Sequence, residues 1–249
     1  MPELSRQSGY SLIELILVVV IVGILASMSL RSIRKATDTV RTEETKRELE
    51  LLAHAIAGNP ELLSAGGRSS YGYVGDVGAL PPDLDALAAN PGGYSTWNGP
   101  YIHDQLSAGG ADAYFKVDAW GTAYAYAGST TISSTGGPVA ITRSLANSVD
   151  DLLYNKVSVV VFSLCGAPPG TGYQDSITVL LTFPDGAGDW SISSGSPDAG
   201  GRLDIDSIPI GLHDLRVVYL PDSDTLIRRI NIDPGTAQYL EITLAEDYW

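Results

Sequence analysis

Residues 9–30 read GYSLIELILVVVIVGILASMSL, and this stretch decides how the N-terminal part of the chain is built. Glu14 is its only charged residue, and the apolar run around it approaches the roughly 20 residues that a helix needs to span a bilayer. A carboxylate inside a bilayer is costly, so Glu14 needs a partner or a function there. The run therefore predicts a membrane-spanning helix in which one acidic side chain has a specific task.

A short polar leader, MPELSRQSG, precedes the run and ends in Gly9. The order of leader, glycine, aromatic Tyr10 and an apolar helix with a glutamate at its fifth position resembles the class III signal of type IV pilins and pseudopilins. The resemblance implies that a prepilin peptidase cuts after Gly9 on the cytoplasmic side and that the freed amine of Tyr10 is methylated. It also implies that Glu14 neutralises this amine, in its own subunit or in a neighbour, within the apolar core of a filament.

Two other interpretations of the run stay open. A secretory signal peptide would be cut at a small-residue site, and residues 26–28 (Ala-Ser-Met) offer one. A plain signal anchor would remain uncut, and the basic residues within 31–35 would then favour an external N-terminus. Neither interpretation gives a role to Glu14 or to the junction after Gly9.

The helix is expected to continue well beyond the apolar run. Its second half is amphipathic, with apolar side chains at the i, i+3, i+4, i+7 spacing: Leu49, Leu52, Ala53 and Ile56. Because Gly58-Asn59-Pro60 ends the pattern, we expect one helix over residues 10–57, about 72 Å long. Residues 58–79 are rich in Gly, Ser and Tyr without a clear period, and we predict an exposed loop there.

Three motifs then follow in order: ALPPDLDALAANPGG at 79–93, WNGPYI at 97–102 and DAWGTAYAY at 118–126. This order resembles the major pseudopilin of type II secretion systems, in which a short helix, a W-x-G-P-Y segment and a D-P-W-G hairpin form a small globular head. The resemblance covers residues 9–154, with Ala119 standing where the family usually has proline. We expect a helix over residues 84–89 capped by Asp83, and a core made by the Trp and Tyr side chains of the motifs.

The resemblance also implies a calcium loop at the end of this head, and the corresponding residues are 141–155. The candidate oxygen ligands are Ser144, the carbonyl of Leu145, Asn147, Asp150 and Asp151. Calcium takes about six to eight oxygen ligands, and this loop supplies few carboxylates. The alternative that Asp150 or Asp151 only caps a turn therefore stays open, as does a site holding magnesium or no ion.

From Lys156 on, the chain consists of short runs, several with period-two alternation, separated by Gly, Pro and Asp. The runs are KVSVVVFSL, DSITVLLTF, GRLDIDSI, HDLRVVYL, DTLIRRINI and QYLEITL. This pattern predicts a β-sandwich, and GGRLDIDSIPIGLHDLRVVY resembles the carboxypeptidase regulatory-like, or transthyretin-like, fold. The loop acids Asp185, Asp189, Asp198, Asp204 and Asp206 are either a second cation site or simply solvated.

The composition of the chain and the motifs that it lacks disfavour several classes of function. The 29 acidic and 15 basic residues give a net charge of −14, which disfavours nucleic-acid binding. Cys165 is the single cysteine, so no intrachain disulfide forms, and we expect this residue to be buried. The chain has no H-E-x-x-H, G-x-S-x-G or P-loop motif, and we expect no catalytic activity.

The sequence thus predicts an α+β chain with a long N-terminal pilin helix, a small pseudopilin-like β-sheet head and an all-β sandwich. The expected parts are a leader (1–9), a transmembrane and filament-core helix (10–57), the head (58–154) and the sandwich (155–249). The resemblance implies a homopolymer filament, a prepilin peptidase, the inner-membrane assembly machinery and the membrane as partners. Before assembly the single helix would hold the chain in the inner membrane. After assembly the chain would lie in a periplasmic or cell-surface filament.

Two further functions stay open at this point. The sandwich would make the chain a minor or tip subunit if it acts as an adhesin or binds a ligand. Alternatively, the chain is a membrane-anchored binding protein, in which case no cleavage after Gly9 is needed.

Overall fold

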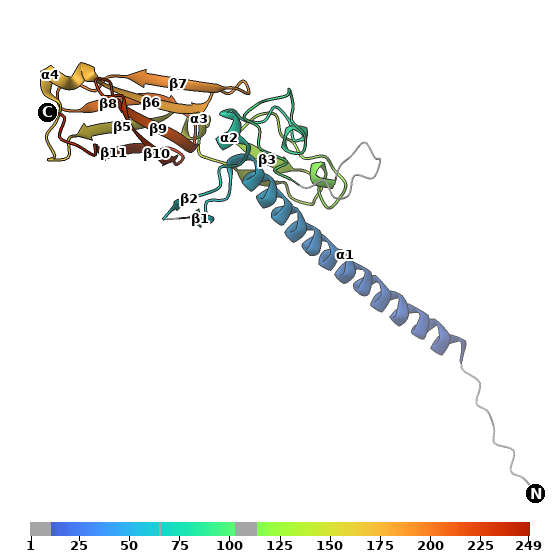
Figure 1. Ribbon diagram of the computed structural model, residues 1–249. Helices are drawn as coiled ribbons and strands as arrows, with labels where there is room; N and C mark the ends of the chain where they lie inside the picture. The colour runs from blue at the N-terminus through green and yellow to red at the C-terminus, as the bar shows by residue number, and fades with distance from the viewer. Residues whose placement is uncertain (1–10, 65, 103–113) are drawn as a thin grey trace, which may run out of the picture.

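The computed structural model describes residues 11–64, 66–102 and 114–249. Its most prominent element is α1 (Leu12–Ala57), a single helix of 46 residues that extends far from the rest of the molecule (Figure 1). At its end, the backbone N–H of Gly58 donates to the carbonyl of His54, and Gly58 has a φ of 78° that favours glycine. The long helix and its predicted end at Ala57 are therefore confirmed.

The two halves of α1 differ in burial. The apolar side chains of the first half are exposed, from Leu12 at 77% to Leu30 at 59%. The last turns bury Leu49, Leu52 and Ile56 almost completely against the head. Within the described residues, only the second half of the helix is held by the fold.

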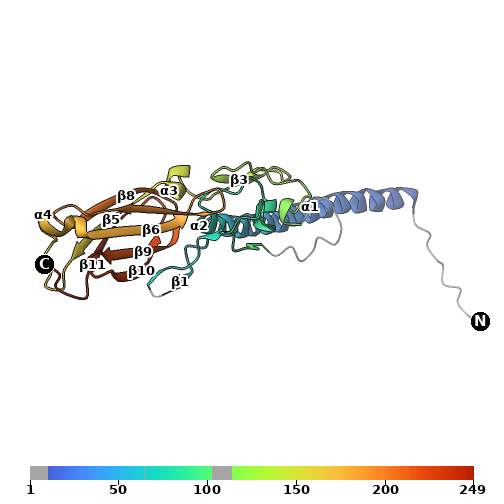
Figure 2. The same cartoon turned by 45° about the horizontal axis from the view of Figure 1, so that its top comes forward.

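The remaining elements are shorter; those of the head, such as β3, lie against the second half of α1, and the sandwich strands lie beyond its end (Figure 1). They are β1 (Leu63–Ser64), β2 (Gly67–Arg68), α2 (Gly72–Val77), η1 (Asp85–Leu87), η2 (Tyr114–Lys116), β3 (Thr131–Ser134), β4 (Ile141–Ser144), α3 (Val149–Leu153), β5 (Asn155–Phe162), α4 (Gly170–Tyr173), η3 (Gln174–Ser176), β6 (Ile177–Pro184), β7 (Trp190–Gly195), β8 (Arg202–Ile208), β9 (Gly211–Tyr219), β10 (Asp224–Ile232) and β11 (Ala237–Thr243). Figure 2 shows how α1, the head and the sandwich follow one another along the molecule.

The prediction of an exposed loop for residues 58–79 is wrong. This segment forms the β1–β2 hairpin and the helix α2, and it contributes fully buried side chains to the head core: Tyr73, Val74 and Val77. A Cβ on Gly72 would lie 2.5 Å from the carbonyl oxygen of Ala55, so glycine is what lets α2 approach the end of α1 so closely. The glycines that permit this packing also weaken the helical signal in the sequence.

The predicted helix over residues 84–89 is a shorter 3₁₀ turn, η1. Asp83 still acts near its start, because its Oδ1 accepts a hydrogen bond of 3.1 Å from the backbone N–H of Ala86. The expected aromatic core is present. Trp97 meets Tyr101 edge to face with ring centroids 5.6 Å apart, and its indole N–H donates to the carbonyl of Ala86.

The β-sandwich is confirmed. Its layers are a four-stranded sheet in the order β10-β9-β6-β7 and a three-stranded sheet in the order β11-β5-β8. All pairings are antiparallel except the parallel pairing of β11 with β5. Alternate side chains point between the layers, such as Val157, Val159 and Val161 of β5. No run for β7 was predicted, because its sequence WSISSG contains only two large apolar side chains.

The head and the sandwich are joined by buried contacts. Ile210, in the short connection between β8 and β9, is completely buried in the head core, and its N–H donates to the carbonyl of Leu152 at 2.9 Å. The hydroxyl of Tyr71 donates to Asp233 at 3.0 Å across the same junction. The predicted division at residues 154–155 falls between α3 and β5, and its status as a domain boundary stays a prediction.

The prediction that Cys165 is buried is wrong. The residue is exposed, since it lies in the turn just after β5, beyond the alternating apolar run. Its backbone N–H donates to a carboxylate oxygen of Asp247.

Candidate assembly surface

The exposed first half of α1 presents a long run of apolar side chains. Its most apolar 18-residue window has a mean hydropathy of 2.7 and is 0% buried, so by length and composition the helix can cross a membrane. The apolar side chains surround the helix on all sides, because the consecutive residues 17–20 are all apolar and exposed and successive residues lie about 100° apart around the axis. A helix that is apolar all round requires apolar surroundings all round.

Glu14 lies in the first turn of α1, three residues after the N-cap residue Ser11. The N-terminus of a helix carries a partial positive charge, so an acidic side chain is favoured there. Within the described part of the chain the neighbours of Glu14 on the helix surface are apolar: Leu15, Val18 and Val19. Its predicted partner, the amine of Tyr10, and the predicted cleavage residue Gly9 lie outside the described residues, so both of these roles stay predictions.

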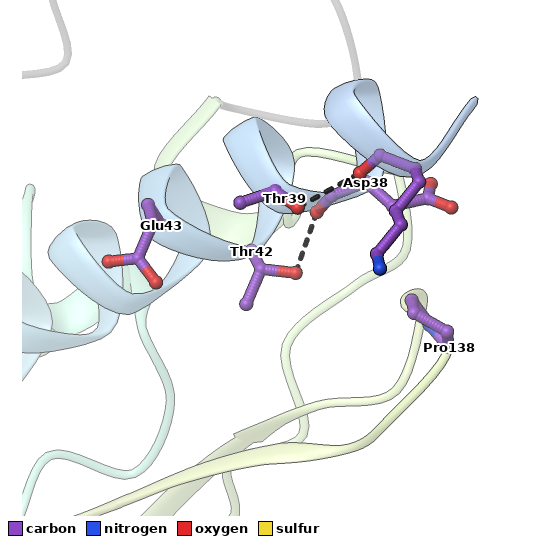
Figure 3. Close-up of a pocket in the computed structure, with 6 residues that line it drawn as sticks. Asp38, Thr39, Thr42, Glu43 and Pro138 are labelled. Atoms are coloured by element: carbon purple, nitrogen blue, oxygen red, sulfur yellow. Dashed lines mark hydrogen bonds between the residues drawn. The ribbon is translucent and has the colours of Figure 1, made fainter. Parts of the chain in front are cut away.

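A surface pocket of about 390 Å³ lies where α1 passes under the loop between β3 and β4. Figure 3 shows the helix residues on one side and Pro138 of the loop on the other. The hydroxyls of Thr39 and Thr42 donate to the carbonyls of Lys35 and Asp38, at 2.9 Å and 2.7 Å. Since these hydroxyls are already paired, the pocket presents mainly the charged groups of Lys35, Asp38 and Glu43.

Two polar residues of α1, Thr45 and Glu48, form hydrogen bonds with the head, and neither was predicted to do so from the sequence. The hydroxyl of Tyr124 donates to the Glu48 carboxylate, and burial raises the pKa of Glu48 although this hydrogen bond opposes the rise. The backbone N–H of Ala119 donates to the hydroxyl of Thr45, a buried residue of α1. These contacts fix the DAWGTAYAY segment on the helix.

Asp118 organises this segment from the inside, and it is only 4% exposed. Its Oδ1 accepts from the backbone N–H groups of Trp120 and Thr122 at 3.0 and 2.9 Å. Its Oδ2 accepts from the Ser134 hydroxyl at 2.6 Å and from the N–H of Gly136 at 3.1 Å. Burial alone would raise the pKa of Asp118, but the four hydrogen bonds to its carboxylate have the larger combined effect. The pKa of Asp118 is therefore lowered. The carboxylate thus closes the turn without a proline at Ala119.

Two of the candidate calcium ligands, Ser144 and Asp151, already have structural partners. The Ser144 hydroxyl donates to the carbonyl of Ala146 at 2.7 Å. Asp151 forms a capping box with Ser148 at the start of α3, which is the turn-capping role left open above. Asn147 and Asp150 are exposed, whereas Leu145 is half-buried. Neither these contacts nor the donor set demonstrates a fit to calcium, and calcium binding stays a prediction.

The loop acids of the sandwich do not form one cation site. Asp185 and Asp198 each accept backbone N–H groups of their own turns, and Asp204 binds the guanidinium of Arg202 at 2.9 Å. Among residues 11–64, 66–102 and 114–249, no group of three or more His, Cys, Asp or Glu side chains is placed to hold a metal ion. The second cation site considered from the sequence is therefore wrong for these residues.

Comparison with known proteins finds a family model and a relative to which this chain is similar. Residues 4–30 match the family model described as the prokaryotic N-terminal methylation motif. The chain is 32% identical over 100 residues to the type II secretion system core protein G of Xanthomonas campestris pv. campestris. This alignment covers 40% of the chain and 60% of that protein, so the chain spans less than two thirds of the relative's length.

The similarity to solved structures covers the chain only in part. One is the dioxygenase domain of a dioxygenase carbohydrate-binding protein fusion from Streptomyces sp. SirexAA-E, at 13% identity and a TM-score of 0.30, covering 38% of this chain and 81% of that one. Another is a putative carbohydrate binding protein from Pseudomonas aeruginosa, at 14% identity and a TM-score of 0.25, covering 38% and 90%. At these TM-scores neither similarity supports an inference about this chain.

The methylation motif and the similarity to protein G together confirm the resemblance of this chain to the type IV pilins and pseudopilins.

Proposed function

We propose that this pilin-like chain is a structural subunit of a type IV filament or of a type II secretion pseudopilus, assembled through α1. The observation that carries the proposal is the apolar first half of α1, which is exposed on all sides and overlaps the matched methylation motif. Burying apolar surface is worth about 25 cal/mol per Å², so this helix gains greatly from any apolar surroundings. The membrane supplies them before assembly, and other copies of the helix supply them in the filament.

Processing of the N-terminus prepares the helix to move from the membrane into the filament. A prepilin peptidase cuts after Gly9, the new amine of Tyr10 is methylated, and Glu14 pairs with that amine inside the filament core. A buried charge is tolerable when it is paired, and breaking such a pair by removing one partner is strongly destabilising. The inner membrane holds the chain before assembly, and the inner-membrane assembly machinery moves it into a periplasmic or surface filament. The role is structural and requires no catalytic site.

The arrangement of the molecule supports this proposal. The sandwich lies at the far end of the molecule from the apolar part of α1 (Figure 1). If α1 packs at the centre of a filament, the head covers the helix and the sandwich projects outward. The charged pocket around Lys35 and Glu43 then faces a neighbouring subunit and offers groups of both signs for pairing.

Substitution of Glu14 tests the assembly mechanism. We expect Glu14→Ala to leave membrane insertion intact and to reduce subunits in sheared filaments at least about tenfold, the effect of roughly 1.4 kcal/mol. The matched control is Glu61→Ala, which removes an exposed carboxylate that lies beyond the end of α1 and outside the charged pocket. Assembly of Glu14→Ala at the level of the control would contradict the charge-pair mechanism.

A second candidate is a minor or tip subunit whose sandwich acts as an adhesin or binds a ligand. It is favoured by a fully formed second core, the sandwich core, in addition to the core that surrounds α1. Copy number separates the two candidates. Quantitative immunoblotting of sheared filaments shows an abundant chain for a major subunit and a rare one for a tip subunit.

A further inference from the structure

A cavity of about 540 Å³ opens on the side of the sandwich, between β10, β11 and the β1–β2 hairpin. Both strands are edges of their sheets, so the cavity lies where the two layers are open to solvent. Its volume falls within the range of small-molecule sites, and sites often lie at junctions between parts of a protein. The residues that matter here are Arg228, Ile230, Asp233, Gln238 and Leu240.

Polar residues occupy core-facing positions on both strands at this cavity. On β10, Ile230 and Ile232 are buried between the layers, and Arg228 falls on the same face by alternation, although at the open edge it is exposed. On β11, the buried Ile242 defines the inner face, and Gln238 shares it by the same alternation. The strand pattern predicts apolar side chains at these two positions, so an arginine and a glutamine there need an explanation.

Arg228 and Gln238 can each form further hydrogen bonds. The Oε1 atom of Gln238 is buried and has no hydrogen-bond partner among the described residues. The Arg228 guanidinium reaches only the carbonyl of Glu241, at 3.4 Å, and no carboxylate of the described residues lies within 4.0 Å of it. By contrast, the neighbouring Arg229 is paired with Asp214 at 3.2 Å. The cavity therefore offers an exposed cationic donor with no carboxylate partner among the described residues, and a buried acceptor with no hydrogen-bond partner there.

We propose that this cavity binds a small hydroxylated carboxylate, a sugar acid by its chemistry. The ligand carboxylate accepts hydrogen bonds from Arg228, which suits a planar, charged acceptor. A ligand hydroxyl donates to Oε1 of Gln238, and a second hydroxyl can donate to Asp233. Ile230 and Leu240 provide an apolar wall for the sugar carbons. This binding goes beyond the proposed structural function and does not depend on filament assembly.

The competing explanation is that Arg228 is an inward-pointing charge that keeps the open edge of the sandwich from pairing with other chains. Under that explanation the cavity has no ligand. A binding measurement with a matched neutral probe separates the two.

The test is a titration of the full chain in detergent micelles with D-galacturonate, followed by backbone amide NMR. D-galactose, which lacks the carboxylate, is the matched probe. We expect saturable shifts at Arg228, Ile230, Gln238 and Leu240 with galacturonate, and at least about tenfold weaker binding of galactose. Arg228→Gln should weaken galacturonate binding by a similar factor. Arg216→Gln, on the outer face of β9, should leave it unchanged.

Three results would overturn the proposal: no saturable response to galacturonate, an equal response to galactose, or unchanged affinity in Arg228→Gln. If circular dichroism shows that Arg228→Gln does not fold, Gln238→Leu takes its place. This second variant removes the buried acceptor while keeping the arginine, and it must also weaken binding. Filament assembly is not measured, so failure here leaves the proposed function untouched.

Discussion

Asp118 shows at the scale of one residue how the head depends on a buried carboxylate. Its two oxygens accept hydrogen bonds from three backbone N–H groups and one hydroxyl. Asparagine has the same shape but presents an NH₂ group in place of one oxygen, and it would leave the Ser134 and Gly136 donors without an acceptor. We predict that Asp118→Asn destabilises the folded chain by about 1–3 kcal/mol at pH 7, measured by urea unfolding.

The same residue predicts a pH dependence. The pKa of Asp118 is lower in the folded state than in the unfolded state, where it is about 3.9. Its contribution to stability is therefore complete well above pH 4 and is lost as the pH falls through the lower, folded-state pKa. Asp118→Asn should flatten this acid-side loss, whereas Asp175→Asn, which changes an exposed carboxylate, should not. Equal acid profiles for the wild type and Asp118→Asn would refute this role.

The residues predicted from the sequence for the head were mainly aromatic, and this was correct for Trp97 and Tyr101. Asp118 was quoted only as a letter of its motif, because a sequence gives no measure of how many backbone donors surround a carboxylate. Similarly, Asp151 was a candidate ligand, and the structure places it in a capping box. Asp118 binds Ser134 and Gly136, which only the fold brings near, whereas the capping partner of Asp151, Ser148, lies just three residues before it.

At the scale of elements, α1 is one continuous helix whose two halves have different surroundings. The periodicity of its second half gave the correct buried face: Leu49, Leu52 and Ile56 are each at most 1% exposed. The failures at this scale were α2 and β7. Gly72 and Gly75 obscure the helical pattern of α2, and β7 has serines where a strand usually has large side chains.

Neighbouring leucines on α1 provide a direct test of helix docking. Leu52 is 1% exposed and Leu51 is 58% exposed, so the same substitution creates a cavity at one and not at the other. We predict that Leu52→Ala destabilises the head by about 2–5 kcal/mol, whereas Leu51→Ala changes its stability by less than about 0.5 kcal/mol. Urea unfolding of the detergent-solubilised chain measures both. Similar values for the two variants would mean that the head does not pack on this face.

At the scale of the whole molecule, the junction between head and sandwich is a packed interface. Ile210 of the sandwich is buried in the head core, which no periodicity in the sequence could indicate. The strand runs predicted the sandwich, but they contain no information about which connection inserts into another core. Long-range packing of this kind could not be predicted from the sequence.

Loss of the Ile210 side chain should uncouple the two parts. We predict that Ile210→Ala costs about 2–4 kcal/mol and splits a single unfolding transition into two, followed by calorimetry. Leu212→Ala is the matched control, since Leu212 lies nearby on β9 with 39% exposure. A single transition in Ile210→Ala, unchanged from the wild type, would show that this contact does not couple the head to the sandwich.

The proposed function depends on processing of the apolar helix after Gly9 and on the use of that helix in assembly. The most direct test is the N-terminal sequence and intact mass of the chain taken from sheared surface filaments and from membranes. The proposal predicts a chain that begins at methylated Tyr10 in both fractions. A chain that begins at Met1, or one cut near Ser27, would contradict it and leave a signal-anchored or secreted β-sandwich protein.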